Sequence, residues 1–423
     1  MKQHLASTHS VAAGLRALPQ TTGSFAAAQA AWRFYRNPRL TLPQLVEPLL
    51  EQARSAVSAQ CHQYALVLHD WSALHYTNHP SKADRTLVNG PDDLGYELQT
   101  ALAVSDSDGA PLAPLYLGLR TGSGVHSTRR QQPLPVRSGL DELGRTINYV
   151  ESLEFAKPLV HIVDREADSV LHLRRLKRQG RLFIMRSNDL RRVEHNGESR
   201  LLSEVVKDVA SDFKFSRRVQ YRGRKAHQYV AQTSVRLTRQ AKLKRRRGGI
   251  QQRRYVSGKA IELRLIVAEV RSVEGKVLAS WLLWSNLREE LTASTIALWY
   301  YWRWRIESFY KLLKRGGQHL EQWQQESSLA IARRLLIAAQ ACVIVWVLEH
   351  SEDRRAGPLR ELLVRMSGRL MKRGVEHTAP ALLAGLWNLL AIVDALDDYS
   401  VDELRQMRQT IYDILGSDSE GSH

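Results

Sequence analysis

The sequence predicts a mixed α/β fold: a strand-and-helix core interrupted by an antiparallel β-strand insertion, with N-terminal helices before it and an α-helical C-terminal region after it. Three observations predict this arrangement. Short apolar runs alternate with helical patterns from about residue 61 to 189. From 190 to 290, apolar and polar residues alternate with the period of a half-exposed strand. Beyond 290, long helical patterns follow one another.

Residues 1–60 are expected to form an N-terminal helical segment. The stretch "SFAAAQAAWRFYRN" predicts a helix over 24–37, which Pro38 ends because proline lacks a backbone donor. A second helix is expected from about 42 to 60.

Residues 61–189 are expected to form the first part of the core. Strands are predicted at 64–70, 98–104, 112–119, 159–163 and 181–187, and helices at 139–154 and 167–177. Two of these strands are closed by a carboxylate, Asp70 and Asp164. Side chains at the carboxyl ends of strands in an α/β sheet point into the ligand crevice, so these acids are candidates for one site. The alternative is that each Asp is an ordinary turn residue.

The insertion, residues 190–290, carries most of the excess charge. The net charge of the chain is +18, and the segment from Lys214 to Lys259 holds sixteen Lys or Arg and no Asp or Glu. Arg245, Arg246 and Arg247 lie within it. Such a block attracts polyanions through counterion release, although a solvated surface loop can have the same composition.

Residues 291–350 are expected to complete the core, and 351–423 to form a C-terminal helical region with a polar tail. Helices are predicted at 292–315, 327–350, 358–372 and 379–396.

The helix predicted at 292–315 carries a polar stripe. Tyr300, Arg303, Glu307 and Lys314 fall within about 60° of one another around an axis with 3.6 residues per turn. The stripe would present a phenol, a guanidinium, a carboxylate and an ammonium together. The alternative is an ordinary i, i+4 ion pair between Arg303 and Glu307 on a surface helix.

The two cysteines, Cys61 and Cys342, predict no disulfide framework and suit a reducing compartment. No signal-peptide pattern occurs, and no apolar run reaches the roughly 18 residues of a membrane span, so no membrane association is expected.

Two competing motifs are weaker. A zinc site built from Cys61, His62, His75 and His79 would lack the usual second cysteine. The segment "GSGVHS" (122–127) lacks the third glycine of a dinucleotide-binding loop, and we interpret it as a plain loop.

Four segments, in order along the chain, resemble a known family. They are "AWRFYRNP" (31–38), "YALVLHD" ending on Asp70, "VDREAD" containing Asp164, and the residues Tyr300, Arg303, Glu307 and Lys314, which match the spacing Y-x2-R-x3-E-x6-K. On these motifs the chain resembles the DDE transposases of insertion-sequence family four. The resemblance covers about residues 30 to 350.

The resemblance implies an RNase H-like core in which Asp70, Asp164 and Glu307 are the catalytic residues and the metal ligands. Two Mg²⁺ or Mn²⁺ ions per active site would neutralise the three carboxylates, which otherwise repel one another. The implied reaction is DNA strand cleavage and strand transfer, in a cut-and-paste course through a DNA hairpin.

The implied partners are double-stranded DNA, as transposon ends and as target, and a second copy of the chain in a homodimeric DNA complex. A cytoplasmic, nucleoid-associated protein of a bacterium is expected, without a membrane partner.

DNA contacts are expected from several segments. By resemblance, Tyr300, Arg303 and Lys314 hold phosphates beside the metals. For Trp281, the resemblance implies stacking on a flipped base, and a core aromatic of a strand is an equal alternative. The further candidates share a positive charge and are Arg33 and Arg36 in the segment 1–60, Arg186, Arg245, Arg246 and Arg247.

The chain departs from the family pattern in two places. Trp71 follows Asp70 where relatives often carry a small Thr, and the segment 31–38 lies close to the first residue, where relatives have an additional end-binding region. Two alternative functions are a metal-dependent nuclease without strand transfer and a catalytically inactive DNA-binding relic. The intact acids at Asp70, Asp164 and Glu307 argue against the relic.

Overall fold

The computed structural model describes residues 24–135, 138–247, 250–314 and 316–417. These residues form two compact units. The larger unit contains Leu40–Tyr310 and Glu326–Ala332. The smaller unit contains, of the described residues, 24–39, those of 311–325 and 333–417.

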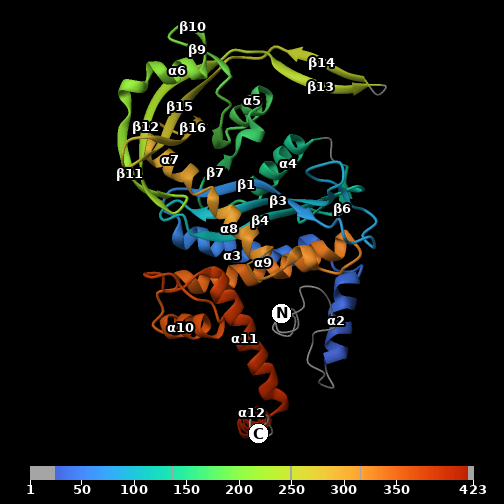
Figure 1. Cartoon of the computed structure of the whole chain (residues 1–423). Coiled ribbons are helices and arrows are strands. Elements are labelled where there is room, and N and C mark those ends of the chain that lie inside the picture. Colours follow the sequence, from blue (N-terminus) through green and yellow to red (C-terminus); the bar gives the residue numbers. More distant parts are fainter. Residues whose placement is uncertain (1–23, 136–137, 248–249, 315, 418–423) are drawn as a thin grey trace. The chain divides into compact units, whose positions relative to one another are not determined.

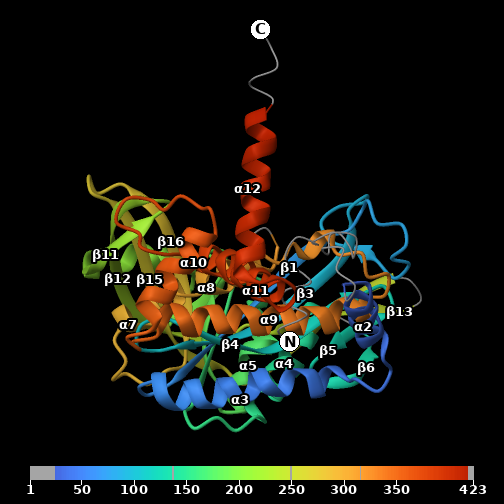
Figure 2. The ribbon, with the colours of Figure 1, turned by 90° about the horizontal axis from the view of Figure 1, so that it is seen from below.

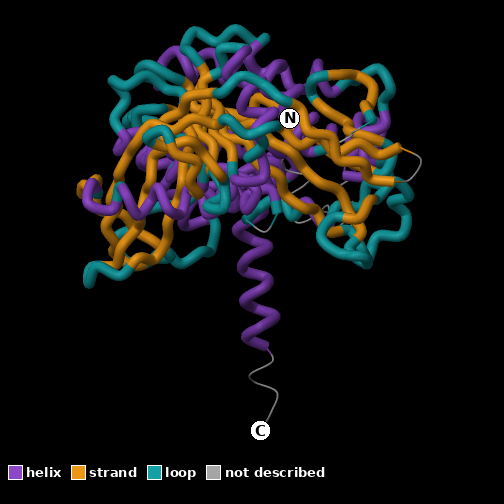
Figure 3. Tube along the Cα trace, turned by 90° about the horizontal axis from the view of Figure 1, so that it is seen from above, coloured by secondary structure: helices purple, strands orange, loops and turns teal. Residues whose placement is uncertain are grey.

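One large sheet organises the larger unit (Figures 1 and 3). Its strands are β1 (Ala65–His75), β2 (Thr86–Leu87), β3 (Leu94–Ser105), β4 (Pro111–Thr121), β5 (Gly124–Ser127), β6 (Arg130–Leu134), β7 (Leu159–Val163), β8 (Leu182–Arg186), β9 (Arg192–His195), β10 (Glu198–Leu201), β11 (Lys214–Tyr221), β12 (Arg224–Leu237), β15 (Ile261–Ser272) and β16 (Val277–Ser285).

The strand order is β10-β9-β12-β15-β16-β8-β7-β1-β3-β4-β5-β6, with β11 paired to β12 and β2 paired to β3. The pairs β1–β7 and β7–β8 are parallel. The remaining pairs of this sheet are antiparallel, so the fold is a mixed α/β fold with a mostly antiparallel sheet.

Helices cover both faces of the central strands. The helices of this unit are α3 (Leu42–Gln60), α4 (Gly139–Glu151), α5 (Val170–Arg178), α6 (Leu202–Asp208), α7 (Ala293–Tyr301) and α8 (Trp304–Leu313), the last as far as Tyr310. In Figures 1 and 2, α3 lies along one face of β3 and β4, while α4 and α5 lie on the opposite side in Figure 1. Because both faces are covered, β7 and the first half of β1 are fully buried and almost entirely apolar.

The start of α3 follows from a capping box. The side chain of Thr41 accepts a hydrogen bond from the backbone N–H of Gln44 at 3.3 Å, and Oε1 of Gln44 accepts one from the N–H of Thr41 at 3.0 Å. These bonds satisfy donors that the first helical turn leaves unpaired.

The segment 190–290 is built mainly of antiparallel strands, as predicted, but it is not a separate sheet. β16 pairs with β8 at Trp284↔Met185, so the inserted strands extend the core sheet. The pattern did not predict α6, which lies between β10 and β11. β13 (Ala241–Arg247) and β14 (Ile250–Val256) pair with each other as a separate two-stranded sheet.

Helices dominate the smaller unit. They are α2 (Ser24–Arg36), α9 (Ser328–His350) from Arg333 onward, α10 (Ala356–Met366), α11 (Ala379–Asp398) and α12 (Val401–Ser417). The carbonyl oxygen of Leu363 in α10 lies so near Gly385 in α11 that a Cβ at Gly385 would be 1.9 Å from it. The close approach of these two helices therefore requires glycine.

The sequence patterns did not predict α12. Its side chains are mostly exposed, and in Figure 2 it projects away from α10 and α11 of the same unit. The polar tail "GSDSEGSH" is predicted at 416–423, but its first two residues belong to α12, and 418–423 lie outside the described residues. Val401, Leu404, Met407, Ile411 and Ile414 recur at helical spacing, so the sequence does carry the apolar periodicity of this helix.

By length and composition, α9 and α11 could each cross a membrane, with 72% of the α9 window and 29% of the α11 window buried. The search for an uninterrupted apolar run was therefore too strict a criterion, because helices with one or two charged residues also meet the length and composition of a membrane span. For α9, the burial is that of a core helix, which meets the same criterion.

His172 provides a pH test of the core. This side chain lies on α5 and is 6% exposed. Burial, together with the positive charge of Arg175 and the neighbouring His161, lowers its pKa to about 4. An unfolded chain, with an ordinary histidine pKa of about 6.5, binds more protons between these two values.

We therefore expect stability to fall as pH is lowered through this window, by roughly 2 kcal/mol between pH 7 and pH 5 for this residue. Urea unfolding of wild type and His172→Leu at both pH values measures it. The variant should lose less stability on acidification than wild type, and the exposed control His62→Gln should behave as wild type. Equal losses in His172→Leu and wild type would show that His172 is not a source of acid sensitivity.

Candidate active site

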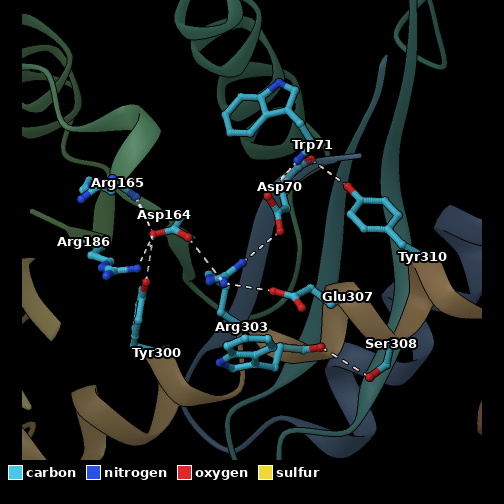
Figure 4. Close-up of polar contacts among 11 residues, drawn as sticks. Asp70, Trp71, Asp164, Arg165, Arg186, Tyr300, Arg303, Glu307, Ser308 and Tyr310 are labelled. Carbon is cyan, nitrogen blue, oxygen red and sulfur yellow. Dashed lines mark hydrogen bonds and ion pairs between the residues drawn. The ribbon is translucent and has the colours of Figure 1, made fainter. Parts of the chain in front are cut away.

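Three segments that lie far apart in the sequence bring polar side chains together in the larger unit (Figure 4). Asp70 lies on β1, and Asp164 follows the last residue of β7. Tyr300 lies at the end of α7, and Glu307 lies in the first turn of α8. Arg303 comes between these two helices in the sequence, and its side chain lies among Asp70, Asp164 and Glu307.

The parallel ladder between β1 and β7 places the two aspartates. It ends at His69↔Val163, so Asp70 and Asp164 are the next residues on neighbouring strands. The prediction that the first strand ends at Asp70 is wrong, because β1 continues to His75 in antiparallel pairing with β3. At this point the parallel partner stops, which leaves space beside Asp70 for side chains from other segments.

Asp164 caps a single 3-10 turn. Its Oδ1 accepts hydrogen bonds from the backbone N–H of Arg165 at 2.6 Å and from the hydroxyl of Tyr300 at 3.2 Å. Nη1 of Arg186, at the end of β8, lies 3.5 Å from the same oxygen. The carboxylate is therefore held from the turn, from α7 and from the neighbouring strand.

Arg303 makes the central contacts. Its Nη1 donates to Oδ2 of Asp70 at 2.9 Å. Its Nη2 donates to Oε1 of Glu307 at 3.2 Å and lies 3.5 Å from Oδ2 of Asp164. The Arg303 side chain is only 8% exposed. One buried guanidinium thus links three carboxylates from three segments.

The single helix predicted over 292–315 is wrong. α7 ends at Tyr301, two turn residues follow, and α8 begins at Trp304. Trp302, in the break, packs against Gly109, where a Cβ would come within 2.5 Å of the indole ring. The polar stripe therefore does not arise from one helix: Arg303 comes from the break.

Burial and charge give the two aspartates different proton affinities. Burial raises the pKa of Asp70 to about 6, and Arg303 and a backbone N–H oppose that rise only in part. Burial also raises the pKa of Asp164, but Arg303, a backbone N–H and two further side chains together hold it below its usual value. Asp70 is thus the carboxylate with the less complete charge compensation.

Tyr310, on α8, also contacts the β1 side of the site. Its hydroxyl donates to the carbonyl oxygen of Asp70 at 2.8 Å. Burial is the largest reason that the pKa of Tyr310 is raised well above its usual value, so the hydroxyl stays a donor. The sequence patterns did not single out this residue, which lies three positions after Glu307.

The donor set fits Mg²⁺ or Mn²⁺. Carboxylate oxygens from three segments converge on one positive group, and hard divalent ions prefer such oxygens. Within the described ranges, no group of three His, Cys, Asp or Glu side chains is placed to hold one metal ion as it stands. Arg303 lies between the three carboxylates, so a metal would have to share them with Arg303 or displace it.

Two further residues from the sequence prediction lie close by. Arg186 faces Asp164, as described above. Trp281, on β16, is 6% exposed, and its ring lies 6.0 Å from that of Tyr300, centroid to centroid. Stacking of Trp281 on a flipped base would therefore require neighbouring side chains to move.

Other predicted DNA contacts lie in the smaller unit. Lys314 follows the end of α8, and its Nζ is 3.4 Å from Oε1 of Glu321. Arg33 and Arg36 are exposed on α2, and the guanidinium of Arg36 lies 4.2 Å from the centroid of the Trp32 ring.

Part of the basic segment 214–259 forms a hairpin of β13 and β14. Arg245, Arg246 and Arg247 are the last residues of β13, and Gly248 and Gly249 after them lie outside the described residues.

The residues of the zinc alternative have other partners. Nδ1 of His75 lies 2.8 Å from Oδ1 of Asp93, and Nδ1 of His79 lies 3.2 Å from a lysine Nζ. Burial raises the pKa of the Cys61 thiol to about 11. The segment 122–127 forms a turn and strand β5, which pairs with β4, so it does not open a helix as a dinucleotide loop does.

Residues 140–346 match a family model described as a transposase DDE domain. The matched range includes Asp164, Tyr300, Arg303 and Glu307, and it begins after Asp70. This match supports a transposase function. No curated protein matches the chain.

Among solved structures, the chain is similar to a cryo-EM structure of a piggyBac transposase synaptic complex with hairpin DNA. The sequence identity is 10% and the TM-score is 0.36. The similarity covers 84% of this chain and 57% of that chain, so this chain spans less than two thirds of that protein's length. A similarity at this level does not define the fold.

The central guanidinium leads to a prediction about metal and stability. Removing one partner of a buried ion pair leaves uncompensated charge, at a typical cost of about 3–5 kcal/mol. Arg303→Ala should therefore melt at a lower temperature than wild type in EDTA. Millimolar Mn²⁺ should narrow the difference, because a divalent cation can compensate the same carboxylates.

Thermal melting in EDTA and in Mn²⁺ checks this. The control is Arg54→Ala, which removes an arginine from a half-exposed pair with Glu47 at 3.0 Å. Its small deficit should be the same in both solutions. A deficit of Arg303→Ala that Mn²⁺ leaves unchanged would contradict a shared site for the two cations.

Proposed function

We propose that this protein is a DDE transposase that cleaves DNA strands and transfers them, and that it is of the insertion-sequence family four type. The observation that carries the proposal is the convergence of Asp70, Asp164 and Glu307 on one guanidinium. The family-model match over residues 140–346 supports it. A structural salt bridge needs one carboxylate, whereas three from separate segments suit a multivalent cation site.

An RNase H-like core is part of the proposal. Its support is the strand order β4-β3-β1-β7-β8, in which the two strands that position Asp70 and Asp164 are neighbours. The third acid, Glu307, comes from a helix that follows the β-rich segment 190–290.

Asp70, Asp164 and Glu307 would hold Mg²⁺ or Mn²⁺ ions, two per active site. When bound, such ions supply activation of an attacking oxygen and stabilisation of a leaving oxygen at phosphorus. The hydroxyl of Tyr300, which donates to Asp164, keeps that carboxylate oriented. Arg303 can present its planar guanidinium to a phosphate through two parallel hydrogen bonds once its carboxylates have another cation.

The proposed reaction is a series of exchanges of one P–O bond for another. Water attacks a strand and frees a 3′-hydroxyl. That hydroxyl attacks the opposite strand to give a hairpin, water opens the hairpin, and the 3′-hydroxyl then joins to target DNA. Lys314 would contribute a further phosphate contact, and Trp281 a stacking surface.

The remaining expectations are also part of this proposal. A homodimer would hold two transposon ends, and the site of action would be the bacterial nucleoid. The basic segment that includes β13 and β14 would bind the DNA backbone by counterion release. Arg33, Arg36 and Arg186 would add contacts of the same kind.

Substitution of the acids tests the central claim. Asp70→Asn, Asp164→Asn and Glu307→Gln should each abolish Mn²⁺-dependent nicking of supercoiled plasmid, because each removes a charged oxygen donor. DNA affinity should stay close to wild type in gel-shift measurements. The control is Glu166→Gln, an exposed acid two residues from Asp164, which should nick normally.

The products distinguish the alternatives. Joined products with terminal-repeat DNA are expected of a transposase, and nicks without joining would indicate a nuclease. Near-wild-type nicking by any of the three variants would remove that residue from the site. A wild-type chain that binds DNA and never nicks it would be the inactive relic.

The basic hairpin gives an independent prediction on DNA affinity. Replacing Arg245, Arg246 and Arg247 together with Ala should weaken binding to every sequence tested. It should also make the slope of log affinity against log salt shallower by up to about 3, roughly one unit for each DNA phosphate that the protein no longer neutralises.

Fluorescence anisotropy over a salt series measures that slope. The control removes three positive charges elsewhere, at the exposed residues Arg354, Lys372 and Arg373. An unchanged slope in the hairpin variant, or an equal change in the control, would assign the hairpin to the solvated-loop alternative.

A further inference from the structure

One buried carboxylate near the candidate active site has no role in the mechanism above. Asp168 lies four residues after Asp164, and its side chain is 2% exposed. Its hydrogen bonds and ion pair within the described ranges go to residues other than Arg303, so it is not one of the three converging acids. A carboxylate this deeply buried must have its charge and lone pairs satisfied by the protein.

Arg191 is its charged partner. Nη2 and Nε of Arg191 lie 2.8 Å and 3.3 Å from Oδ2 of Asp168. Nη2 also donates to the backbone carbonyl oxygen of Asp168 at 2.7 Å. The guanidinium is itself only 14% exposed, so the pair is shielded from water.

Neutral donors from the segment after β8 and from β16 complete the set. The backbone N–H of Asn188 donates to Oδ2 at 3.0 Å, and the hydroxyl of Ser187 is 3.5 Å from it. Nε1 of Trp284, on β16, donates to Oδ1 at 3.3 Å. Trp284 is fully buried, so Asp168 connects its own turn to the segment that follows β8 and to the end of β16.

The turn between the two aspartates is short and rigid. It is one 3-10 turn, Arg165–Ala167, with Asp164 as its N-cap and Asp168 as its C-cap. The N–H of Ala167 donates to the carbonyl oxygen of Asp164 at 3.1 Å, and the N–H of Asp168 donates to that of Arg165 at 3.0 Å. Fixing Asp168 therefore fixes Asp164 at the other end of the turn.

The contacts of Asp168 also affect the position of Arg186. Ser187 and Asn188 directly follow Arg186, whose Nη1 lies 3.5 Å from Oδ1 of Asp164. The N–H of Ser187 also donates to the carbonyl oxygen of Leu282 on β16 at 2.7 Å. Asp168 thus sets the distance between the strand end that carries Arg186 and the turn that begins at Asp164.

From this geometry we infer that Asp168 is a positioning residue: it holds the Asp164 carboxylate in place for the metal ions and DNA of the proposed transposase site. The inference rests on the proposed function. Its chemical requirement is specific, because Oδ2 receives donors from both Arg191 and Asn188 while Oδ1 receives one from Trp284. An asparagine has a single acceptor oxygen and would direct an N–H₂ group at a donor.

The experiment compares Asp168→Asn with a matched control, Glu142→Gln. Glu142 is also a buried acid, with a side chain that is 4% exposed and that accepts from the hydroxyl of Tyr116 at 2.6 Å and from Nη2 of Arg129 at 3.0 Å. Three quantities are measured for wild type and both variants: melting temperature, affinity for Mn²⁺ alone by calorimetry, and single-turnover cleavage of pre-bound DNA.

Both variants should melt below wild type. Only Asp168→Asn should bind Mn²⁺ about 10–100-fold more weakly and cleave bound DNA slower by a similar factor, as is typical when a group that orients a metal ligand is removed. Mn²⁺ affinity and cleavage in Asp168→Asn equal to those of Glu142→Gln would overturn the inference and leave Asp168 a purely structural residue.

A milder variant covers the case in which Asp168→Asn does not fold. Arg191→Lys keeps the charge and removes the fork of two donors, so it should weaken Mn²⁺ binding several-fold, and unchanged binding would overturn the inference. The metal measurement also separates the two proposals. Wild type that binds Mn²⁺ but never cleaves DNA would refute the transposase proposal while still deciding the role of Asp168, and wild type that binds no Mn²⁺ would refute both.

Discussion

The contact of Arg303 with three carboxylates is the interaction on which the rest of the site depends. Asp70, Asp164 and Glu307 would repel one another if they were brought together without a cation. The guanidinium offers a donor to each of them, at 2.9 Å, 3.5 Å and 3.2 Å respectively. Its own burial is tolerable only because those partners are present. The elements that carry these four residues must therefore be held in positions that keep all three contacts with Arg303.

These four residues are placed where regular secondary structure ends. The β1–β7 ladder stops at His69↔Val163, and the next residue on each strand is an acid. The helical run near residue 300 is broken, and Arg303 stands in the break, with α7 before it and α8 after it. Side chains from separate segments can approach one another at these points, because the backbone pairing of β1 with β7 and the helical run both end there. Asp168 then secures the turn after β7 through donors from the segment that follows β8 and from β16.

The positively charged residues fall into two groups, one with a structural role and one with a potential role in binding nucleic acid. Arg303 and Arg191 are buried and paired with acids inside the larger unit. The sixteen Lys and Arg of 214–259 have no acid among them, so they cannot be balanced locally along the chain. Much of this segment extends the core sheet as β11 and β12, and the remainder forms the β13–β14 hairpin. A concentration of positive charge of this kind attracts polyanions.

Local sequence patterns are sufficient to predict the apolar strands, the helices 24–36 and 42–60 to within a residue, and Asp70, Asp164, Glu307, Tyr300, Arg303 and Lys314 as candidates. These follow from local periodicity, from turn chemistry and from motif spacing, which act over a few residues. The folded structure is needed to show that β1 runs past Asp70, that the helix near 300 is broken, and that inserted strands join the core sheet. It also decided that Asp168 and Tyr310 belong around the site. Each of these depends on partners distant in sequence: the strand that stops beside Asp70, the glycine under Trp302, the pairing of β16 with β8, and the donors at Arg191 and Trp284. Local sequence cannot encode such contacts, because their free energy arises only when the segments meet in the folded chain.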